Sequence, residues 1–259
     1  MEGKSVMKSV GKFLETYWVT GLIYVGLVVL YVIIADNKLV DAFLFPPAQS
    51  IVTAFANNKD VMLKNMLSSF QLMIPSIAIS LLIALPLGTF LGMNARARKS
   101  LHPVMYTVSV IPSILLAPFA LLIAPSFRTA SLFLVVYGTI WSTLFATITG
   151  IQTIDKRYLD NAATLELHGF KKLFRVILPA ASPSILAGFV NSLRGSFVIL
   201  VYAEMYGAKY GMGYFVKKYS EYGLYSETWA GFLFMVVILV IVMQFFERIK
   251  TYLLKWTIN

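Results

Sequence analysis

The sequence predicts an all-α integral membrane protein with six transmembrane helices. Of its 259 residues, 58% are hydrophobic and only 13% are charged, which leaves too little polar surface to cover a soluble globule. The apolar residues gather in windows long enough to cross a hydrocarbon core, which takes about 20 residues in a helix. These windows are much longer than the alternating segments of about 10 residues in a membrane β-barrel, so helices are expected.

The spans are expected to form one permease-like transmembrane domain over residues 1–259. Their approximate bounds are 17–35, 65–95, 103–127, 129–150, 183–203 and 228–247. The first is a span rather than a secretory signal, because its apolar run exceeds a signal core of about 7–15 residues. Pro112, Pro118 and Pro125 predict that the third segment is bent or broken. Ala48–Asn58, directly after Pro46-Pro47, is predicted to be a separate short outer helix.

The distribution of basic residues predicts the orientation of the chain. With the N-terminus inside, fourteen of the 22 Lys and Arg residues fall in cytoplasmic pieces and seven in outer pieces, while Arg194 lies within a span. The positive-inside rule therefore places both termini and residues 151–182 in the cytoplasm, on a chain of the cell inner (plasma) membrane. The net charge of +10 is then a topological signal and not a sign of nucleic-acid binding.

The cytoplasmic segment 151–182 is too long for a simple connection, which usually takes about 4–6 residues. Apolar residues recur at helical spacing on both sides of His168-Gly169. They are Leu159, Ala162, Ala163 and Leu167 before the turn, and Phe170, Leu173, Phe174 and Ile177 after it. Two short amphipathic helices are expected, either docked on a protein or lying on lipid headgroups. Pro179 and Pro183 are expected to stop the second helix.

These residues also carry a resemblance to a known family. Asp160-Asn161-Ala162-Ala163, with Leu165, Phe174 and Val176-Ile177-Leu178-Pro179, resembles the "EAA" loop of the inner-membrane permeases of ATP-binding-cassette importers. Three further stretches support the resemblance in the same order along the chain. They are Phe45-Pro46-Pro47, Ile111-Pro112 with Ala117-Pro118, and Ala203-Glu204-Met205 with Gly207, Gly211 and Gly213. The branch that transports nitrate, sulfonates, taurine and bicarbonate is the most similar.

The resemblance implies a permease subunit that forms the pathway for a small solute, such as a sulfonate, taurine, nitrate or bicarbonate. Its partners would be a second copy of itself, two ATPase subunits, an extracytoplasmic binding protein and the lipid bilayer. The residues expected to dock the ATPase are Asp160, Ala162, Ala163, Glu166, Leu167, Gly169, Phe170 and Phe174. Because the chain has no G-x-x-x-x-G-K-[ST] motif, ATP and magnesium are assigned to the partner, with no cofactor or metal in this chain.

Glu166 stands where the family has a glycine in the turn of the loop. The turn is therefore expected to shift toward His168-Gly169. Glu166 itself is interpreted either as a solvated helix residue or as an ion-pair partner of the ATPase.

The predicted substrate pathway is built around Arg194. A central Arg costs at least about 2.5–3.5 kcal/mol in a span, so it must face protein or water. It either attracts an anionic solute or pairs with backbone carbonyls or a carboxylate, such as Glu204 of a neighbouring copy. Asn191 and Gln71 are expected to share its polar cavity, and Tyr202 and Tyr206 to form part of an outer gate. The full predicted set is Gln71, Asn191, Arg194, Tyr202, Glu204 and Tyr206.

Other functions remain as alternatives. The same mechanism could import a vitamin or a pyrimidine precursor. A secondary transporter is a less favoured alternative, because such proteins more typically show duplicated halves or intramembrane ionisable relays, and neither is recognised in this sequence. A membrane enzyme is not expected, because the chain has two histidines, no cysteine and no carboxylates at metal spacing.

Overall fold

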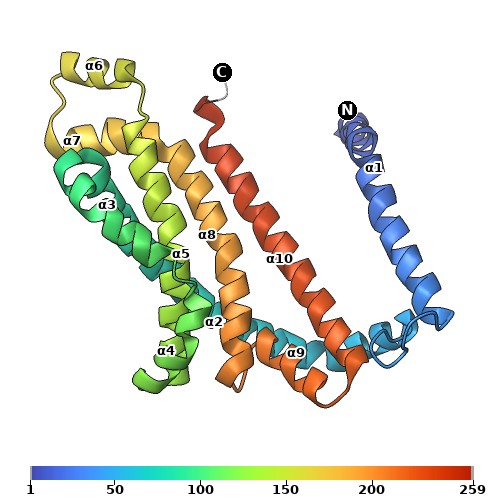
Figure 1. The fold of residues 1–259 in the computed structure, drawn as a ribbon. Coiled ribbons are helices and arrows are strands. Elements are labelled where there is room, and N and C mark those ends of the chain that lie inside the picture. The colour runs from blue at the N-terminus through green and yellow to red at the C-terminus, as the bar shows by residue number, and fades with distance from the viewer. Residues whose placement is uncertain (1, 258–259) are drawn as a thin grey trace. The chain divides into compact units, whose positions relative to one another are not determined.

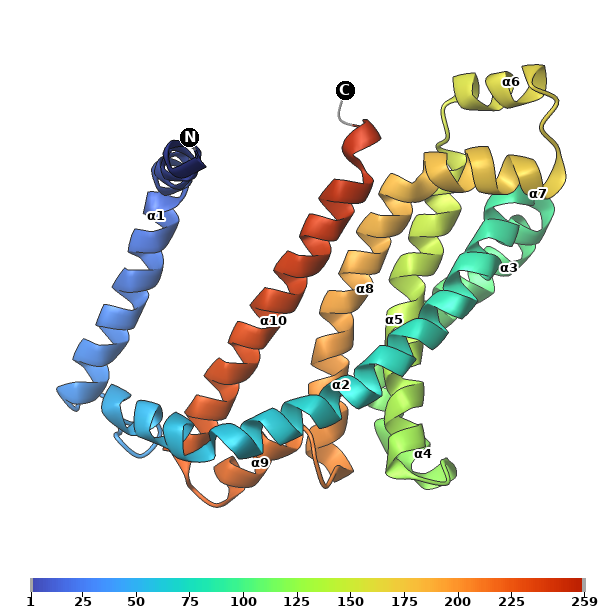
Figure 2. The ribbon, with the colours of Figure 1, turned by 180° about the vertical axis from the view of Figure 1, so that it is seen from behind.

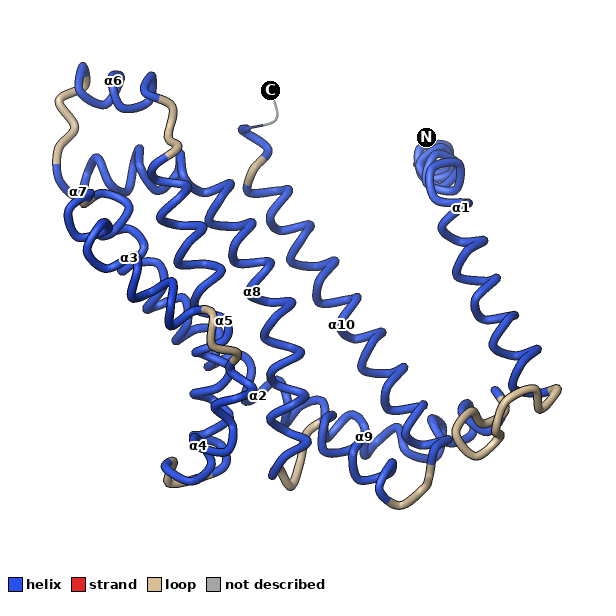
Figure 3. The backbone as a smooth tube through the Cα atoms, viewed as in Figure 1, coloured by secondary structure: helices blue, strands red, loops and turns tan. Residues whose placement is uncertain are grey.

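The computed structural model describes residues 2–257, with side-chain detail for residues 18–256, and every regular element in that part of the chain is a helix (Figures 1 and 3). The predicted all-α class is confirmed. The elements are α1 Glu2–Asp36, α2 Ala48–Met93, α3 Ala95–Ser109, η1 Ser113–Leu116, α4 Ala117–Ile123, α5 Phe127–Gln152, α6 Lys156–Thr164, α7 Gly169–Lys172, η2 Leu173–Ile177, α8 Leu178–Gly207, α9 Met212–Glu221, α10 Tyr225–Leu253 and η3 Lys255–Thr257. The side chains of Lys4, Lys8 and Lys12, used for the orientation, lie outside the described residues.

Five helical stretches of the described chain are long and apolar enough to cross a membrane. They are Trp18–Asp36 of α1, α2, α5, the continuous stretch Gly169–Gly207, and α10. A sixth span results if α3 and the η1–α4 segment are counted together, although they are bent by 74° at their junction. The predicted break in the third segment is therefore confirmed, and it falls just before Pro112, which precedes η1 with an extended backbone.

Two predicted helix boundaries are wrong. Ala48–Asn58 is not a separate helix, because it runs without interruption into α2. No glycine or proline occurs between residues 48 and 74 to end the helix there. Likewise, Pro179 and Pro183 do not stop the second of the two helices predicted for residues 151–182. A π-helical turn, η2, precedes Pro179, which occupies the first turn of α8 where its missing N–H is tolerated. Figure 2 shows the ribbon turning from α7 into α8 without a loop.

The chain divides into two units, Met1–Lys59 with Tyr219–Ala230, and Asp60–Lys218 with Gly231–Asn259. In the second unit, α5 and α8 pack closely through small residues. A Cβ on Gly188 would collide with Ala146 and the Ser142 carbonyl. The buried Ser192 hydroxyl donates to the Thr139 carbonyl at 2.7 Å and lies 2.8 Å from the Thr143 hydroxyl. Small residues and interhelical hydroxyl bonds are the usual means of joining helices in a membrane.

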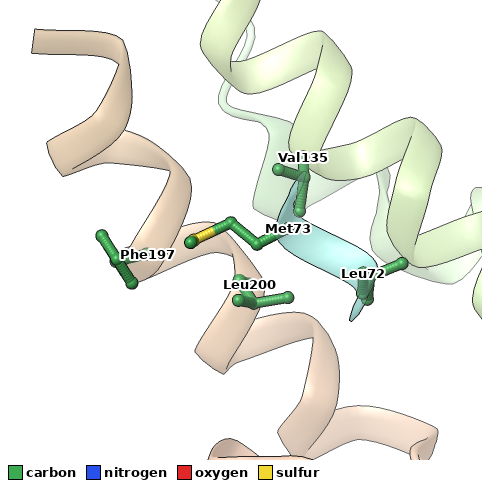
Figure 4. Packing of buried hydrophobic residues seen from close by; sticks show 5 residues of the cluster. All are labelled: Leu72, Met73, Val135, Phe197 and Leu200. Carbon is green, nitrogen blue, oxygen red and sulfur yellow. The ribbon is translucent and has the colours of Figure 1, made fainter. Parts of the chain in front are cut away.

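An apolar cluster attaches α2 to this pair. Figure 4 shows Leu72 and Met73 of α2 beside Val135 of α5 and Phe197 and Leu200 of α8, all of them buried. The cluster fixes which face of α8 points into the unit. The opposite face of α8 is thereby left uncovered by this core.

In the first unit, Trp229 at the start of α10 packs against the segment that follows α1. The Trp229 indole N–H donates to the Leu44 carbonyl at 2.9 Å, and its ring lies 5.6 Å from that of Tyr31. The Tyr31 hydroxyl in turn donates to the Pro46 carbonyl at 2.8 Å. The Phe45-Pro46-Pro47 motif is therefore explained by the packing of this unit.

Candidate docking surface and transport pathway

Helix α6 begins with a side-chain cap. The Asp155 carboxylate accepts a hydrogen bond from the Arg157 backbone N–H at 2.9 Å and another from its guanidinium at 2.6 Å. These hydrogen bonds with Arg157, together with its positive charge, hold the pKa of Asp155 below its ordinary value. A carboxylate at this position also interacts favourably with the N-terminal end of the helix dipole.

The end of α6 is set by Glu166, whose φ is +51°. The Glu166 N–H donates to the Ala163 carbonyl at 3.0 Å, and the Leu167 N–H donates to the Ala162 carbonyl at 2.9 Å. These two bonds form a Schellman motif, in which glycine is the usual left-handed residue. The prediction that the turn moves to His168-Gly169 is therefore wrong for the end of α6, and Glu166 is not a helix residue.

The start of α7 uses a second left-handed residue, Gly169, whose φ is +54°. Between the two, His168 Nδ1 lies 2.8 Å from the Glu166 carbonyl oxygen, which can only accept, so Nδ1 carries a proton. The first of the two expected short helices is thus confirmed as α6, whereas the second, α7, is the beginning of the continuous helical stretch Gly169–Gly207. The turn between them runs from Glu166 to Gly169.

Phe170 of α7 and Phe174 of η2 are exposed, and we call this pair of side chains the docking patch. They are 79% and 64% exposed, and Leu165, just after α6, is 69% exposed. The two phenylalanine rings lie 6.5 Å apart and nearly parallel, with an interplanar angle of 20°. Lys171, Lys172 and Arg175 stand between or beside the rings in the sequence, so the patch combines an apolar centre with a basic rim.

The other predicted docking residues divide into two groups. Asp160, Ala163, Glu166 and Gly169 are exposed, and Leu167 is half-buried. Ala162 is only 1% exposed, and it lies beside a cavity of about 230 Å³ that Asn161, Arg175 and Trp256 also line. Its inclusion among the ATPase contacts is corrected, since α6 buries it against the rest of this chain.

Four of the six predicted pathway residues lie on one face of α8: Asn191, Arg194, Tyr202 and Tyr206. Together with Val198 on the same face they form what we call the α8 stripe. Asn191, Arg194, Val198 and Tyr206 are exposed and Tyr202 is half-buried. Their spacing of three or four residues keeps them on one side of the helix. Val190, Leu193, Phe197 and Leu200 are buried on the other side. The stripe is therefore the face of α8 that the core leaves uncovered.

Arg194 has an acidic partner within the same chain. Its guanidinium lies 3.5 Å from Glu247 Oε1 of α10, and the Arg194 side chain is 62% exposed. Glu247 is also paired with Lys250. The adjacent rings of Phe189 and Phe246 meet edge to face at 5.5 Å. Sequence reasoning missed Glu247 and Lys250, although their i, i+3 spacing is a recognisable ion-pair signal.

Gln71 and Glu204 do not join Arg194. Both line a different cavity of about 200 Å³, which we call the turn cavity, beside Ser68, Arg128, Lys209 and Tyr210. The Arg128 guanidinium donates to the backbone carbonyl of Gln71 at 3.2 Å. The prediction that Gln71 shares a cavity with Arg194 is wrong, and the two cations of the turn cavity were not anticipated as site residues.

Glu204 has a structural function at the start of α9. It is 2% exposed, and its carboxylate accepts the Gly213 N–H at 2.8 Å. Asn65 and Ser69 of α2 accept the neighbouring N–H groups of Gly211 and Met212 at 2.8 and 2.9 Å. Three side chains from two helices thus satisfy the first amides at α9, which would otherwise lack partners.

Gly211 and Gly213 are required by the same arrangement. Gly211 has a φ of +121°, and a Cβ there would collide with the Glu204 carboxylate. A Cβ on Gly213 would meet the Val201 carbonyl. The predicted need for glycines around the Ala203-Glu204-Met205 motif therefore has a defined cause.

One family model and several known proteins are similar to this chain. Residues 84–259 match the family model described as "Binding-protein-dependent transport system inner membrane component". The chain is 26% identical over 245 residues to the proposed aliphatic sulfonates transport permease protein SsuC of Bacillus subtilis, covering 92% of this chain and 88% of that one. It is 24% identical over 184 residues to the bicarbonate transport system permease protein CmpB of Synechococcus elongatus, covering 70% and 64%.

A further relative is the nitrate import permease protein NrtB of Synechococcus elongatus, 28% identical over 129 residues, or 50% of this chain and 46% of that one. The fold is similar to a chain of the MetNI methionine ABC transporter in an inward-facing conformation, with a TM-score of 0.64 and 15% identity, covering 74% of this chain and 96% of that one. The family model spans more than half of the sequence and includes α6, α7 and α8. This chain therefore belongs to the family of binding-protein-dependent transport system inner membrane components, the permeases of ATP-binding-cassette importers.

Proposed function

We propose that this permease forms half of the translocation pathway of an importer for a small anion. The observation that carries the proposal is the α8 stripe, which presents Arg194 on a membrane-spanning helix away from the core of its own chain. A cation in that position is costly against lipid. It is accommodated if the stripe faces a second copy across a water-containing pathway, since two copies related by a two-fold axis present the same face to each other.

The complete importer would contain two copies of this chain, two ATPase subunits and one extracytoplasmic binding protein. The docking patch supports the ATPase contact, because stacked aromatic rings with a basic rim can anchor in a groove on a partner. ATP and magnesium would bind to the ATPase subunits. Both termini and the α6–α7 pair would face the cytoplasm, as the distribution of Lys and Arg indicates.

The solute class is supported by two independent groups of cations. Arg194 lies on the α8 stripe, and Arg128 with Lys209 lines the turn cavity. The names of three relatives refer to the transport of sulfonates, nitrate and bicarbonate, all of which are small oxyanions. We therefore favour a small oxyanion over a neutral solute for this chain.

Reconstituted uptake would test the proposal. The permease is placed in liposomes with its ATPase and binding protein, and uptake of labelled nitrate, bicarbonate and ethanesulfonate is measured with and without ATP. We expect ATP-dependent uptake of at least one anion and its loss in Phe170→Asp, with insertion unchanged. Leu39→Asp, at an equally exposed residue in the loop after α1, is the matched control and should transport normally. Uptake by the permease alone without ATP would overturn the proposal.

A further inference from the structure

We propose that Glu247 is a displaceable counter-ion in the pathway, which pairs with Arg194 when the pathway is empty and yields Arg194 to the anionic solute. This inference rests on the proposed function, because it requires the α8 stripe to face the pathway. It adds a residue of α10 to the solute site and assigns a reason for the ion pair between α8 and α10.

The unequal distances around Glu247 support this exchange. Arg194 Nη2 stands 3.5 Å from Glu247 Oε1, whereas charge-assisted N–H···O bonds usually measure about 2.7–2.9 Å. Glu247 Oε2 makes a closer contact with Lys250, three residues later on the same helix. Glu247 is thus held mainly by its own helix, and Arg194 is held loosely. Removal of Arg194 from the pair leaves Glu247 with a cationic partner, Lys250, so the carboxylate is not left unpaired.

The charge balance of the cluster favours an anion. Arg194 and Lys250 carry two positive charges and Glu247 carries one negative charge, so the cluster has a net charge of +1. Arg248, which directly follows Glu247 on α10, is exposed and adds positive charge near this cluster. Asn191, one helical turn before Arg194 on the stripe, offers an amide N–H to the same region. A monovalent anion bound here would neutralise the Arg194–Glu247–Lys250 cluster.

The chemistry of Arg194 defines the class of ligand further. A guanidinium presents a planar set of N–H donors that matches two oxygens of a carboxylate, and equally two oxygens of nitrate, bicarbonate or a sulfonate. Such an oxyanion can therefore take the place of the Glu247 carboxylate. A neutral solute has no charge with which to compete for Arg194, so Arg194 would stay paired with Glu247 in its presence.

The competing explanation is a fixed tether between α8 and α10. The edge-to-face contact of Phe189 with Phe246 beside the ion pair is compatible with such a tether. A tether requires only that opposite charges meet, whichever helix carries each sign. A displaceable counter-ion requires the positive charge on the α8 stripe, so the two explanations predict different results for exchanged charges.

The direct test is the chemical reactivity of Arg194 in the purified full-length chain in lipid nanodiscs. Phenylglyoxal modifies accessible guanidinium groups, and mass spectrometry reports each arginine separately. We expect sodium nitrate to slow modification of Arg194 several-fold relative to sodium gluconate at equal ionic strength, while Arg175 on η2 serves as an internal reference and is unaffected. Glu247→Gln should raise the rate at Arg194 without nitrate and make nitrate protective at lower concentration.

Absence of nitrate protection, or an unchanged rate in Glu247→Gln, would overturn the counter-ion proposal. Because this measurement uses neither ATPase nor binding protein, its result is independent of whether the reconstituted importer works. The exchanged variant Arg194→Glu/Glu247→Arg adds a second criterion. We expect it to assemble but not to restore the anion uptake lost in Arg194→Glu, whereas restored uptake would show that the pair is only a tether.

Discussion

Glu166 adopts a left-handed backbone conformation that non-glycine residues disfavour, because the turn at the end of α6 requires it. It completes the Schellman motif of α6 with a φ of +51°, in a region that costs a non-glycine residue about 1–2 kcal/mol. The motif is retained because its two hydrogen bonds to Ala162 and Ala163 satisfy the last carbonyls of α6. The turn is therefore stable but strained.

We predict that Glu166→Gly stabilises the chain by about 1 kcal/mol, since glycine adopts this conformation without strain. Glu166→Ala controls for loss of the carboxylate and should have almost no effect, because alanine keeps the strain. Ala163→Gly, inside α6, should destabilise by a similar amount. Thermal unfolding in detergent would compare the three, and equal effects of Gly and Ala at position 166 would show that the backbone conformation is not the cause.

Gly211 presents the opposite case, in which glycine is already required. Gly211→Ala should destabilise the chain by about 1–3 kcal/mol, because the residue has a positive φ and its Cβ would collide with Glu204. Gly26→Ala is the matched control, since a Cβ there meets nothing within 4 Å, and it should be neutral or mildly stabilising. The difference in unfolding temperature between the two variants is the measurement, and comparable stabilities would contradict the arrangement described around α9.

At the level of individual residues, the sequence predicted the types of residue in the site better than their partners. Phe170 and Phe174 were recognised by helical periodicity and are exposed together. Glu247 was not connected with Arg194, because 52 intervening residues separate them and periodicity reports only neighbours on one helix. The burial of Ala162 could not be predicted from the sequence either, because it depends on which side of α6 packs against η2.

At the scale of the elements, α6 depends on a cap whose strength varies with pH. Because the pKa of Asp155 is lowered in the folded state, the cap is fully effective above the ordinary carboxyl pKa of about 4. Its contribution is lost as the pH falls through the lowered pKa of the folded state. The helix should therefore begin to fray at its N-terminus only in acid.

Hydrogen exchange at residues 157–164, corrected for intrinsic rates, would measure this effect between neutral and acidic pH. We expect protection of α6 to fall in acid in the natural chain. Asp155→Asn keeps a capping side chain but has no charge to titrate, so its protection should change much less with pH. An equal loss in both would exclude the Asp155 carboxylate as the titrating group.

Helix periodicity and apolar length predicted most helices, but proline was a poor guide to their ends. Pro112 marks a real break, whereas Pro179 and Pro183 lie within a continuous helical stretch. The difference arises because η2 supplies a π-helical turn before Pro179, and such local adjustments are common around prolines in membrane helices. The sequence gives no comparable signal for the π-helical turn itself.

At the scale of the whole molecule, the proposal requires the α8 stripes of two copies to face each other across the pathway. The chain has no cysteine, so single cysteines can report this directly. Val198→Cys, on the exposed stripe, should be joined to its counterpart in membranes by a bifunctional maleimide that reaches across the pathway, because a direct disulfide needs Cα atoms within about 7 Å. Val28→Cys, similarly exposed on α1, should not, and dimers at position 28 but not 198 would contradict the proposed pathway.

The central claim is that the docking patch joins this permease to its ATPase, and site-specific cross-linking tests it most directly. A cysteine-reactive photocross-linker is attached to Phe170→Cys and, separately, to Ala162→Cys in the assembled importer. Phe170 is exposed whereas Ala162 is buried in its own chain, so we expect a permease–ATPase product from position 170 and little or none from position 162. A complex that forms without any product from position 170, or that yields its main product from position 162, would contradict the account.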